Sequence, residues 1–145
     1  PGDRRRVGLT RVRACESLVR ALADTVGRMS KPLGPYTPAV RAGDFIFVSG
    51  QVGARDGALV DGGVTGQTAQ AVANLVERLA EMGASLTDVV KTTCFLRDMD
   101  DFAAFNAAYV EGFGDHRPAR STVAVRELPV GAQVEIEAVV YRPLG

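Results

Sequence analysis

The sequence predicts an α+β domain in which two helices cover one face of a single β-sheet. From residue 36 onward, short β-branched runs alternate with two segments of helical periodicity. Some of the strand segments, such as residues 45–48, are apolar on both sides of the pleat. Two helices cannot bury both faces of such a sheet, and a second copy of the chain is the simplest cover for the other face. The sequence therefore also predicts a homo-oligomer.

The first two strands are expected to form a hairpin. Residues 38–42 and 44–50 are rich in apolar and β-branched side chains, and Ala42-Gly43 between them predicts the turn. The next segment, residues 53–63, carries glycine and aspartate near both of its ends. Such residues are typical of turns, so this segment is predicted to be a loop.

A first helix is expected to begin with Thr65 as its cap and to run to Met82. Its apolar positions recur every three or four residues, which is typical of a helix with one buried side. Gly83 follows directly and can adopt the left-handed conformation that ends a helix. The expected buried stripe consists of Thr68, Val72, Leu75, Leu79 and Met82.

A second strand and helix follow. Residues 89–96 predict a strand because they form a largely apolar, β-branched run. Asp100 or Asp101 is expected to cap a helix that continues through Phe113, and Gly114 is expected to end it.

The last two strands are expected at residues 120–127 and 133–142, with a turn at 128–131. In the final strand, side chains alternate between the two faces of the sheet. One face is expected to carry Val134, Ile136, Ala138 and Val140, and the other Glu135, Glu137, Val139 and Tyr141.

The composition is that of an ordinary globular domain. Of 145 residues, 46% are hydrophobic and 23% are charged, and the net charge is zero. Residues 1–28 hold seven arginines and three acidic residues, whereas the rest of the chain holds ten basic and fourteen acidic residues. An acidic body disfavours a nucleic-acid partner, because such binding needs clustered lysine and arginine. No apolar run approaches the roughly 20 residues that span a bilayer, so no membrane partner is expected.

The two cysteines, Cys15 and Cys94, provide neither a disulfide framework nor a zinc-binding spacing. Cys94 lies within an apolar strand segment, where a free cysteine behaves as a small hydrophobic residue. These features predict a soluble protein of a reducing, cytoplasmic compartment.

Residues 1–28 are interpreted as an N-terminal extension of a domain that comprises residues 29–145. Apolar residues in this segment have helical spacing, with arginines on the other side. That pattern also fits a targeting segment or a membrane-surface helix, and a helix that packs on the domain is a third interpretation. The extension is favoured because Met29-Ser30-Lys31 resembles an ordinary protein start.

Arg120 is a candidate site residue because it begins an apolar strand, where a cation needs an anionic partner. One candidate partner is Glu135 or Glu137 on the last strand. The other is the carboxylate of a ligand, which the planar guanidinium fits well. The spacing alone favours the internal ion pair somewhat.

Other catalytic arrangements find little support in the sequence. Glu135 and Glu137 are expected about 7 Å apart on one strand face, as paired carboxylates of glycosidases can be. The absence of Trp makes sugar binding a poor interpretation. His116 is the only histidine, and it lies in a predicted loop with no Ser or Cys nucleophile at a recognisable spacing, so neither a Ser-His-Asp triad nor a histidine-based metal site can be assembled. The aspartates of residues 98–101 fit helix capping better than metal binding.

Taken in order, several segments are similar to the signature of the RidA/YjgF family. The resemblance covers about residues 31–142, and its most specific part is the pair Pro118-Ala119-Arg120 and Glu135-Ile136-Glu137-Ala138. The other matching segments are Gly34-Pro35-Tyr36, Ser49-Gly50-Gln51, Val90-Lys91-Thr92-Thr93 and Phe105-Asn106. The resemblance implies a chorismate-mutase-like α+β fold and a homotrimer with active sites in clefts between subunits.

By the same resemblance, the activity expected is hydrolysis of 2-imino acids, of the 2-iminobutanoate and 2-iminopropanoate type, to 2-oxo acids and ammonia without a cofactor or metal. Arg120 is expected to bind the substrate carboxylate, and Glu135 to position the attacking water. The implied supporting residues are Tyr36, Ser49, Gly50, Asn106 and Thr122. Thr122 stands where some members have cysteine, which bears on substrate range. A non-catalytic sensor of 2-oxo or 2-imino acids and, with less support, a ribonuclease are the alternatives.

Overall fold

The structure, a computed structural model, describes residues 32–145. The predictions for residues 1–28, and the boundary at residue 29, fall outside the described residues. Within residues 32–145 no helix is both long and apolar enough to cross a membrane.

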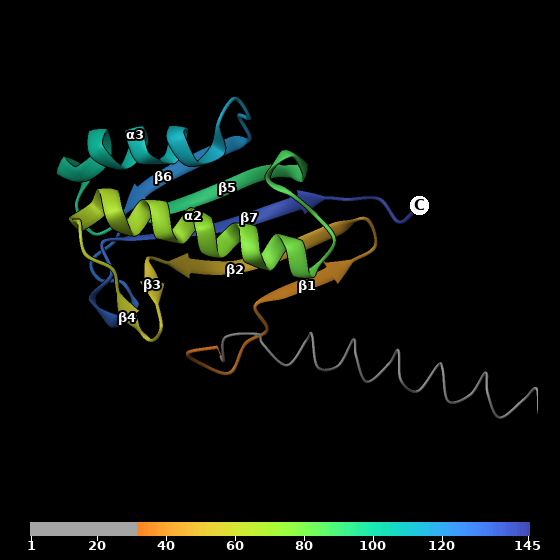
Figure 1. Cartoon of the computed structure of the whole chain (residues 1–145), viewed down its shortest axis with the longest axis horizontal. Helices are drawn as coiled ribbons and strands as arrows, with labels where there is room; N and C mark the ends of the chain where they lie inside the picture. The colour runs from red at the N-terminus through yellow and green to blue at the C-terminus, as the bar shows by residue number, and fades with distance from the viewer. Residues whose placement is uncertain (1–31) are drawn as a thin grey trace, which may run out of the picture. The chain divides into compact units, whose positions relative to one another are not determined.

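A five-stranded sheet forms the centre of the domain, in the order β1-β2-β7-β5-β6 (Figure 1). Only β5 and β6 pair in parallel, and the other neighbours are antiparallel, so the sheet is mixed. The predicted first hairpin is confirmed as β1 and β2. The strand bounds are β1 Ala39–Ala42, β2 Phe45–Val52, β5 Val89–Leu96, β6 Ala119–Ala124 and β7 Val134–Tyr141.

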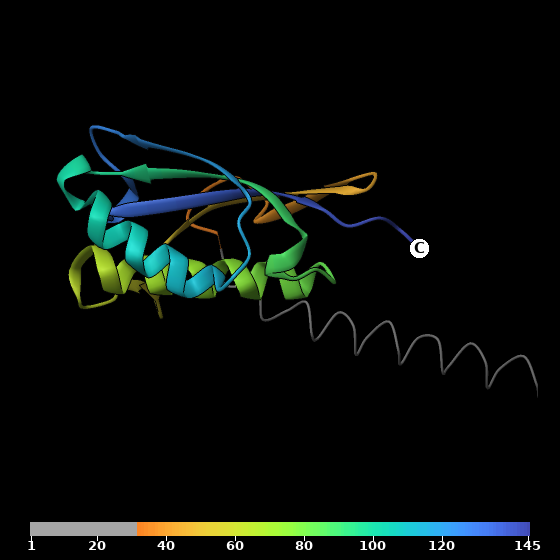
Figure 2. The same cartoon turned by 90° about the horizontal axis from the view of Figure 1, so that it is seen from above.

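Two helices, α2 (Gly63–Glu81) and α3 (Phe102–Phe113), lie on the same side of this sheet in the described part of the chain (Figure 2). The predicted α+β class, with a mixed sheet and two helices on one face, is therefore confirmed. Helix α3 connects the parallel strands β5 and β6, which cannot be joined by a tight turn.

The start of α2 differs from the prediction. The helix begins at Gly63, and its cap is Gly62 in a left-handed conformation with φ 100°, so Thr65 lies inside the first turn and does not cap it. The predicted end is confirmed: Gly83 has φ 71°, and the Ala84 N–H donates to the Leu79 carbonyl at 2.9 Å. This pair is the usual closure of a helix by a left-handed residue.

The start of α3 lies where it was predicted, with Asp101 as the cap residue, but the Asp101 side chain forms no capping hydrogen bond. A 3₁₀ turn, Met99–Asp101, precedes the helix, and the capping side chain is Asp98, whose Oδ1 accepts a hydrogen bond from the Asp100 N–H at 2.9 Å. Asp100 and Asp101 therefore lie within the turn, although the capping role predicted for this acidic cluster is confirmed for Asp98. Helix α3 ends at Phe113, as predicted.

The remaining differences are short elements. The predicted loop of residues 53–63 contains a small hairpin of β3 (Ala54–Arg55) and β4 (Ala58–Leu59), which turns at Asp56-Gly57. Strand β6 ends at Ala124, three residues earlier than predicted, and the turn before β7 is a 3₁₀ turn, Pro129–Gly131.

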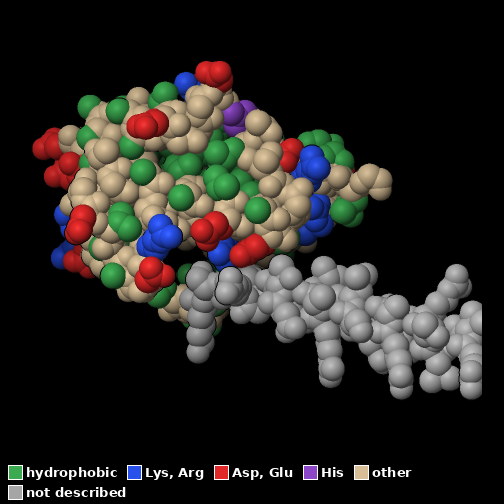
Figure 3. Space-filling model, viewed as in Figure 1, with side chains coloured by type: hydrophobic (Ala, Val, Ile, Leu, Met, Phe, Trp, Pro, Cys, Tyr) green, Lys and Arg blue, Asp and Glu red, His purple; other side chains and the backbone are tan. Residues whose placement is uncertain are grey.

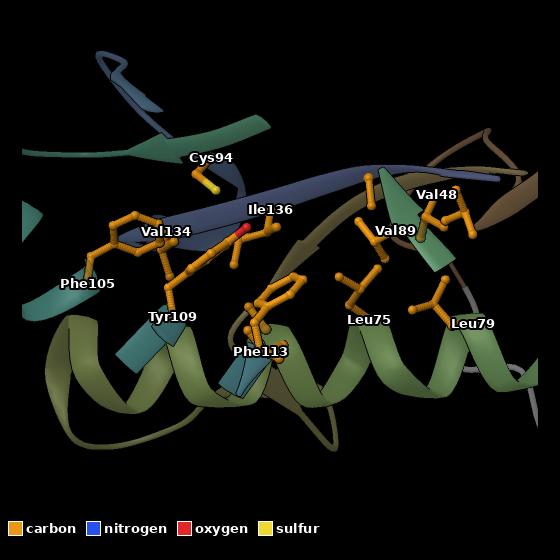
Figure 4. Packing of buried hydrophobic residues seen from close by; sticks show 14 of the residues in the cluster. Val48, Leu75, Leu79, Val89, Cys94, Phe105, Tyr109, Phe113, Val134 and Ile136 are labelled. Carbon is orange, nitrogen blue, oxygen red and sulfur yellow. The ribbon is translucent and has the colours of Figure 1, made fainter. Parts of the chain in front are cut away.

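The core lies between the helices and the sheet (Figure 4). The predicted stripe of α2 is confirmed, because its first four members are buried and Met82 packs against the core. The face of β7 that carries Val134, Ile136, Ala138 and Val140 is fully or almost fully buried, and so is Cys94 on β5. This core holds β5, β6 and β7 in fixed register, and these strands carry the candidate catalytic side chains.

The helix-free face of the sheet carries large apolar side chains that are exposed in the single chain. Their relative exposure lies between 43% and 49%. They come from both edges of the sheet as well as from its interior, and they are Val40, Phe45, Phe47, Val123 and Tyr141. Large apolar side chains that gather on one exposed face are typical of a surface that another protein chain covers.

Candidate active site

Arg120 begins the edge strand β6, and its side chain points to the side of the sheet that the helices cover. Its register partner on β5 is Thr92, which is completely buried beneath α3. The Arg120 Nη2 donates a hydrogen bond of 2.8 Å to the Oδ1 of Asn106 on α3. The structure therefore brings together two of the residues predicted for the site.

Three aromatic rings of α3 surround the Arg120 guanidinium. The distance from the guanidinium carbon to the ring centroid is 4.8 Å for Tyr109, 5.6 Å for Phe105 and 5.7 Å for Phe102. All three distances are within the range of a cation–π interaction. We call Arg120, Asn106 and these rings the Arg120 cluster.

Thr122 lies two residues after Arg120 and therefore on the same face of β6. Its register partner is the buried Cys94, and its own Oγ1 is buried without a hydrogen-bond partner in residues 32–145. Burial raises the pKa of the Cys94 thiol to about 11, although the Thr92 hydroxyl and the Arg120 charge partly offset it. Cys94 is thus a neutral core thiol, because a nucleophilic cysteine needs a lowered pKa.

Glu135 lies on β7, on the helix-free face of the sheet. It follows the buried Val134 and precedes the buried Ile136, so alternation directs it away from the helices. Opposite Glu137, the β2 strand bulges: Val48 pairs with Ala138 and Gln51 with Ile136, which leaves two residues of β2 against one of β7. The two residues in the bulge are Ser49 and Gly50, both predicted for the site.

Gly50 is the residue that makes room for the Glu135 carboxylate. A Cβ atom at position 50 would lie 1.8 Å from the Glu135 Oε1 and 2.6 Å from its Cδ. No side chain can approach so closely, so only glycine allows this carboxylate to lie against the β2 backbone. We call Ser49, Gly50 and Glu135 the Glu135 cluster.

The environment of Glu135 disfavours its negative charge. Burial is the first cause that raises the pKa of its carboxyl, and repulsion from Glu137, two residues along the same strand face, is the second. A raised pKa brings a carboxyl closer to the range in which a general base is effective near neutral pH.

Ser49 connects the bulge to the segment before β1. Its hydroxyl donates to the Thr37 carbonyl at 2.7 Å, and its N–H donates to the Pro38 carbonyl at 2.9 Å. Tyr36, the remaining predicted residue, directly precedes Thr37 and is 46% exposed. It is therefore adjacent in sequence to the Glu135 cluster, and it belongs to neither cluster by a direct hydrogen bond in the described residues.

The two clusters do not meet within one chain. Arg120 faces the helices, whereas Glu135 and Glu137 face the opposite side of the sheet, two strands away and thus about 10 Å across it. The prediction of an internal ion pair, which the spacing of Arg120 favoured, is therefore wrong.

A hollow of about 280 Å³ opens on the helix-free face. Its lining includes Ser49, Lys91, Thr93 and Glu137 but neither Arg120 nor Glu135.

Other groups that could have carried chemistry have structural positions. The His116 Nε2 donates a hydrogen bond of 2.7 Å to the Val89 carbonyl, which fastens the connection between α3 and β6. Among residues 32–145, no three metal-ligating side chains lie close enough to hold an ion together.

The sequence reasoning missed the aromatic part of the Arg120 cluster. Phe102, Phe105 and Tyr109 are spaced by three and four residues on α3, and Asn106 lies next to Phe105. This spacing places all of them on one side of a helix, so the signal was present. What the sequence alone did not indicate is that Arg120 packs against this side.

Comparison with known proteins identifies the family to which this chain and its fold belong. The sequence profile of the family described as Endoribonuclease L-PSP matches residues 27–142. A RutC family protein of Pyrococcus horikoshii is 44% identical over 114 residues, which are 77% of this chain and 90% of that protein. The human 2-iminobutanoate/2-iminopropanoate deaminase is 41% identical over 125 residues, or 85% of this chain and 90% of that protein.

Solved structures of similar proteins have the same fold as this chain. RidA from an Antarctic Psychrobacter matches with a TM-score of 0.74 and 35% identity, over 79% of this chain and 94% of that one. TdcF of E. coli with bound serine matches with a TM-score of 0.73 and 32% identity, over the same shares of the two chains. The chain belongs to the Endoribonuclease L-PSP family, which is the RidA/YjgF family that its sequence resembles. One relative, mmf1 of Schizosaccharomyces pombe, is named as mitochondrial, so a cytoplasmic location stays a prediction.

Proposed function

We propose that this protein is a hydrolytic deaminase that converts small 2-imino acids to 2-oxo acids and ammonia. The observation that carries the proposal is the state of Arg120: its guanidinium is fixed by Asn106 and three rings, and within residues 32–145 it forms no ion pair with a carboxylate. A fixed guanidinium of this kind is suited to bind a carboxylate in a bidentate manner. The human relative named as a 2-imino acid deaminase supports the same assignment.

The reaction asks little of the protein beyond orientation and one base. Arg120 binds the substrate carboxylate, which places the C=N carbon beside the Glu135 carboxylate of the Glu135 cluster. Glu135 accepts a proton from a bound water as the water oxygen adds to that carbon, and a carbinolamine forms. Glu135 then gives this proton to the nitrogen, and as the C–N bond breaks it takes the hydroxyl proton of the carbinolamine, so that the 2-oxo acid forms and ammonia leaves. Holding the reactants in this geometry supplies much of the rate gain.

Because Arg120 and Glu135 face opposite sides of the sheet, the proposed site needs the Arg120 cluster of one subunit and the Glu135 cluster of another. The exposed apolar side chains of the helix-free face support such an assembly. We propose a homotrimer, as the family resemblance implies, with one site in each subunit interface.

The assignment of activity is tested by generating imines from several amino acids with an amino-acid oxidase and measuring 2-oxo acid release with and without the protein. We expect a saturable acceleration above the uncatalysed rate, since small imines already hydrolyse in water. A protein that binds 2-oxo acids and never exceeds the background rate would be a sensor, and the deaminase proposal would fail.

The assignment of the site to two subunits is tested by mixing two inactive variants. Arg120→Ala and Glu135→Gln subunits are co-expressed with different tags, and mixed assemblies are purified through both tags. We expect them to regain about a third of the wild-type activity, because in every mixed trimer one interface of the three combines an intact Arg120 with an intact Glu135. Mixed assemblies that stay as inactive as the parents would show that both residues must come from one subunit.

A ribonuclease is the second candidate, because the family description names one. Its support in this chain is weak. On the side of the molecule seen in Figure 3, acidic and basic side chains are interspersed and form no basic patch. The one histidine is engaged with the Val89 carbonyl. RNA cleavage that survives Arg120→Ala and exceeds that of a mock preparation would favour this candidate.

A further inference from the structure

Tyr109 contacts Arg120 more closely than the other two rings of the Arg120 cluster. Its ring centroid lies 4.8 Å from the guanidinium carbon, and the side chain as a whole is only 3% exposed. Its hydroxyl lies 2.7 Å from the Oγ1 of Thr92, which is completely buried on β5. The hydroxyl bond thus joins the ring that lies against Arg120 to the strand next to Arg120.

The position of Thr92 gives this bond its significance. Thr92 is the register partner of Arg120 across the parallel pair of β5 and β6. The hydrogen bond therefore fixes the Tyr109 ring at the level of the sheet where the Arg120 backbone lies. On α3 the ring lies between two others (Figure 4): Phe105 is 5.7 Å away in a tilted arrangement, and Phe113 is stacked on it at 4.4 Å. Tyr109 is held on both ring sides and at its hydroxyl.

This arrangement stabilises the guanidinium without using its hydrogen-bond donors. Arginine has five N–H donors in one plane, and a cation–π contact occupies none of them. Asn106 accepts from Nη2. An aromatic platform beneath the group, together with a single amide acceptor, fixes its orientation and leaves most of its donors for a ligand.

We propose that Tyr109 is a positioning residue for substrate binding, which holds the Arg120 guanidinium in the orientation that accepts a carboxylate. This inference rests on the proposed function, because it takes the carboxylate of a 2-imino or 2-oxo acid as the ligand of Arg120. Tyr109 acts through Arg120 and needs no contact with the substrate. Its loss should therefore weaken binding and leave the chemical step nearly unchanged, since the contacts of Tyr109 are with Arg120, Thr92 and neighbouring rings and not with the proposed base.

The test compares Tyr109→Leu with Phe113→Leu. Both changes remove a buried ring of the same stack, but Phe113 is not among the rings that contact Arg120. We expect Tyr109→Leu to raise KM for the imine, and the Kd for 2-oxobutanoate measured by calorimetry, about five- to thirtyfold. We expect kcat to change less than about threefold. Phe113→Leu should lower Tm to a similar extent and leave KM and Kd within about twofold of wild type.

A conservative variant separates the ring from its hydroxyl. Tyr109→Phe keeps the platform and removes the bond to Thr92, so its KM and Kd should lie between those of wild type and Tyr109→Leu. Equal changes of KM and Kd in Tyr109→Leu and Phe113→Leu, or none in Tyr109→Leu, would overturn the inference. If wild type binds 2-oxobutanoate without hydrolysing imines, the deaminase proposal fails, and the Kd series still decides the role of Tyr109. If wild type neither binds nor hydrolyses, both fail.

Discussion

Replacing Arg120 by alanine is expected to lower kcat/KM for imine hydrolysis by at least about a hundredfold. The change removes the group that we propose binds the substrate carboxylate, and charge-assisted hydrogen bonds contribute about 1.5–3 kcal/mol each. The fold should persist, because within residues 32–145 Arg120 is half-buried on an edge strand and its partners are one amide and three rings. Initial rates at several imine concentrations, with the uncatalysed rate subtracted, measure the effect.

Arg120→Lys is the matched variant, since it keeps the charge and loses the planar fork. It should recover little activity, because an ammonium group cannot bind a carboxylate in the bidentate way. Circular dichroism and Tm establish that both variants are folded. A folded Arg120→Ala protein with wild-type activity would exclude the proposed carboxylate site. A variant that fails to fold would instead give Arg120 a structural role.

Much of the fold could be predicted because its local patterns agree with its tertiary packing. The alternation in β7 placed Val134 and Ile136 on one face and Glu135 on the other, and in the structure the first face is the buried one. The start of α2 was predicted wrongly because the capping rule favours Thr65, whereas the chain enters the helix through Gly62 with positive φ. The small β3–β4 hairpin had a turn signal in Asp56-Gly57, but strands of two residues leave no pattern of alternation.

The candidate site could be predicted only in part, since it depends on which strands are neighbours. Nothing in the spacing of Arg120 indicates that β6 pairs in parallel with β5, and that pairing decides which face of the sheet its side chain takes. For this reason the ion pair with Glu135 or Glu137 was a reasonable expectation from the sequence, although it is wrong. The roles of Arg120 and Glu135 came from the family resemblance, and they stay predictions.

Glu135→Gln is expected to keep the affinity for a 2-oxo acid and to lower kcat for imine hydrolysis by roughly a hundredfold, the scale of a lost general base. The amide has nearly the shape of the carboxylate but cannot accept a proton from water. Arg120 is unchanged in this variant, so the Kd for 2-oxobutanoate should stay within about threefold of wild type. Equal turnover in wild type and Glu135→Gln would show that the water is held elsewhere.

Gly50→Ala tests the role of the Glu135 carboxylate by moving it and leaving Glu135 itself unchanged. A Cβ at position 50 would lie 1.8 Å from the Glu135 Oε1, so the carboxylate must move from the bulge. We expect kcat to fall while the Kd for 2-oxobutanoate changes little. Gly43→Ala is not a suitable control despite its open surroundings, because φ is +60° there, so Thr65→Ala, an exposed change in the first turn of α2 outside both clusters, serves instead. Full activity in Gly50→Ala would contradict the role of the Glu135 position.

The raised pKa of Glu135 should affect both the pH dependence of activity and the pH dependence of stability. Because the pKa of its carboxyl is raised, by burial first and by Glu137 second, the acid limb of kcat/KM should lie above the range of an ordinary carboxyl. Glu137→Gln should move that limb to lower pH, and Glu135→Gln should abolish it.

Stability should change with pH in the opposite direction to activity. The stabilising contribution of a group with a raised folded pKa is fully present below its ordinary pKa and is lost as pH rises through the raised value. Glu135→Gln should therefore raise Tm at neutral pH, with a gain that disappears in acid. If Glu135→Gln loses turnover and gains Tm at neutral pH, the Glu135 carboxylate serves catalysis and destabilises the fold. A lower Tm of this variant at neutral pH would indicate that the carboxylate stabilises the fold.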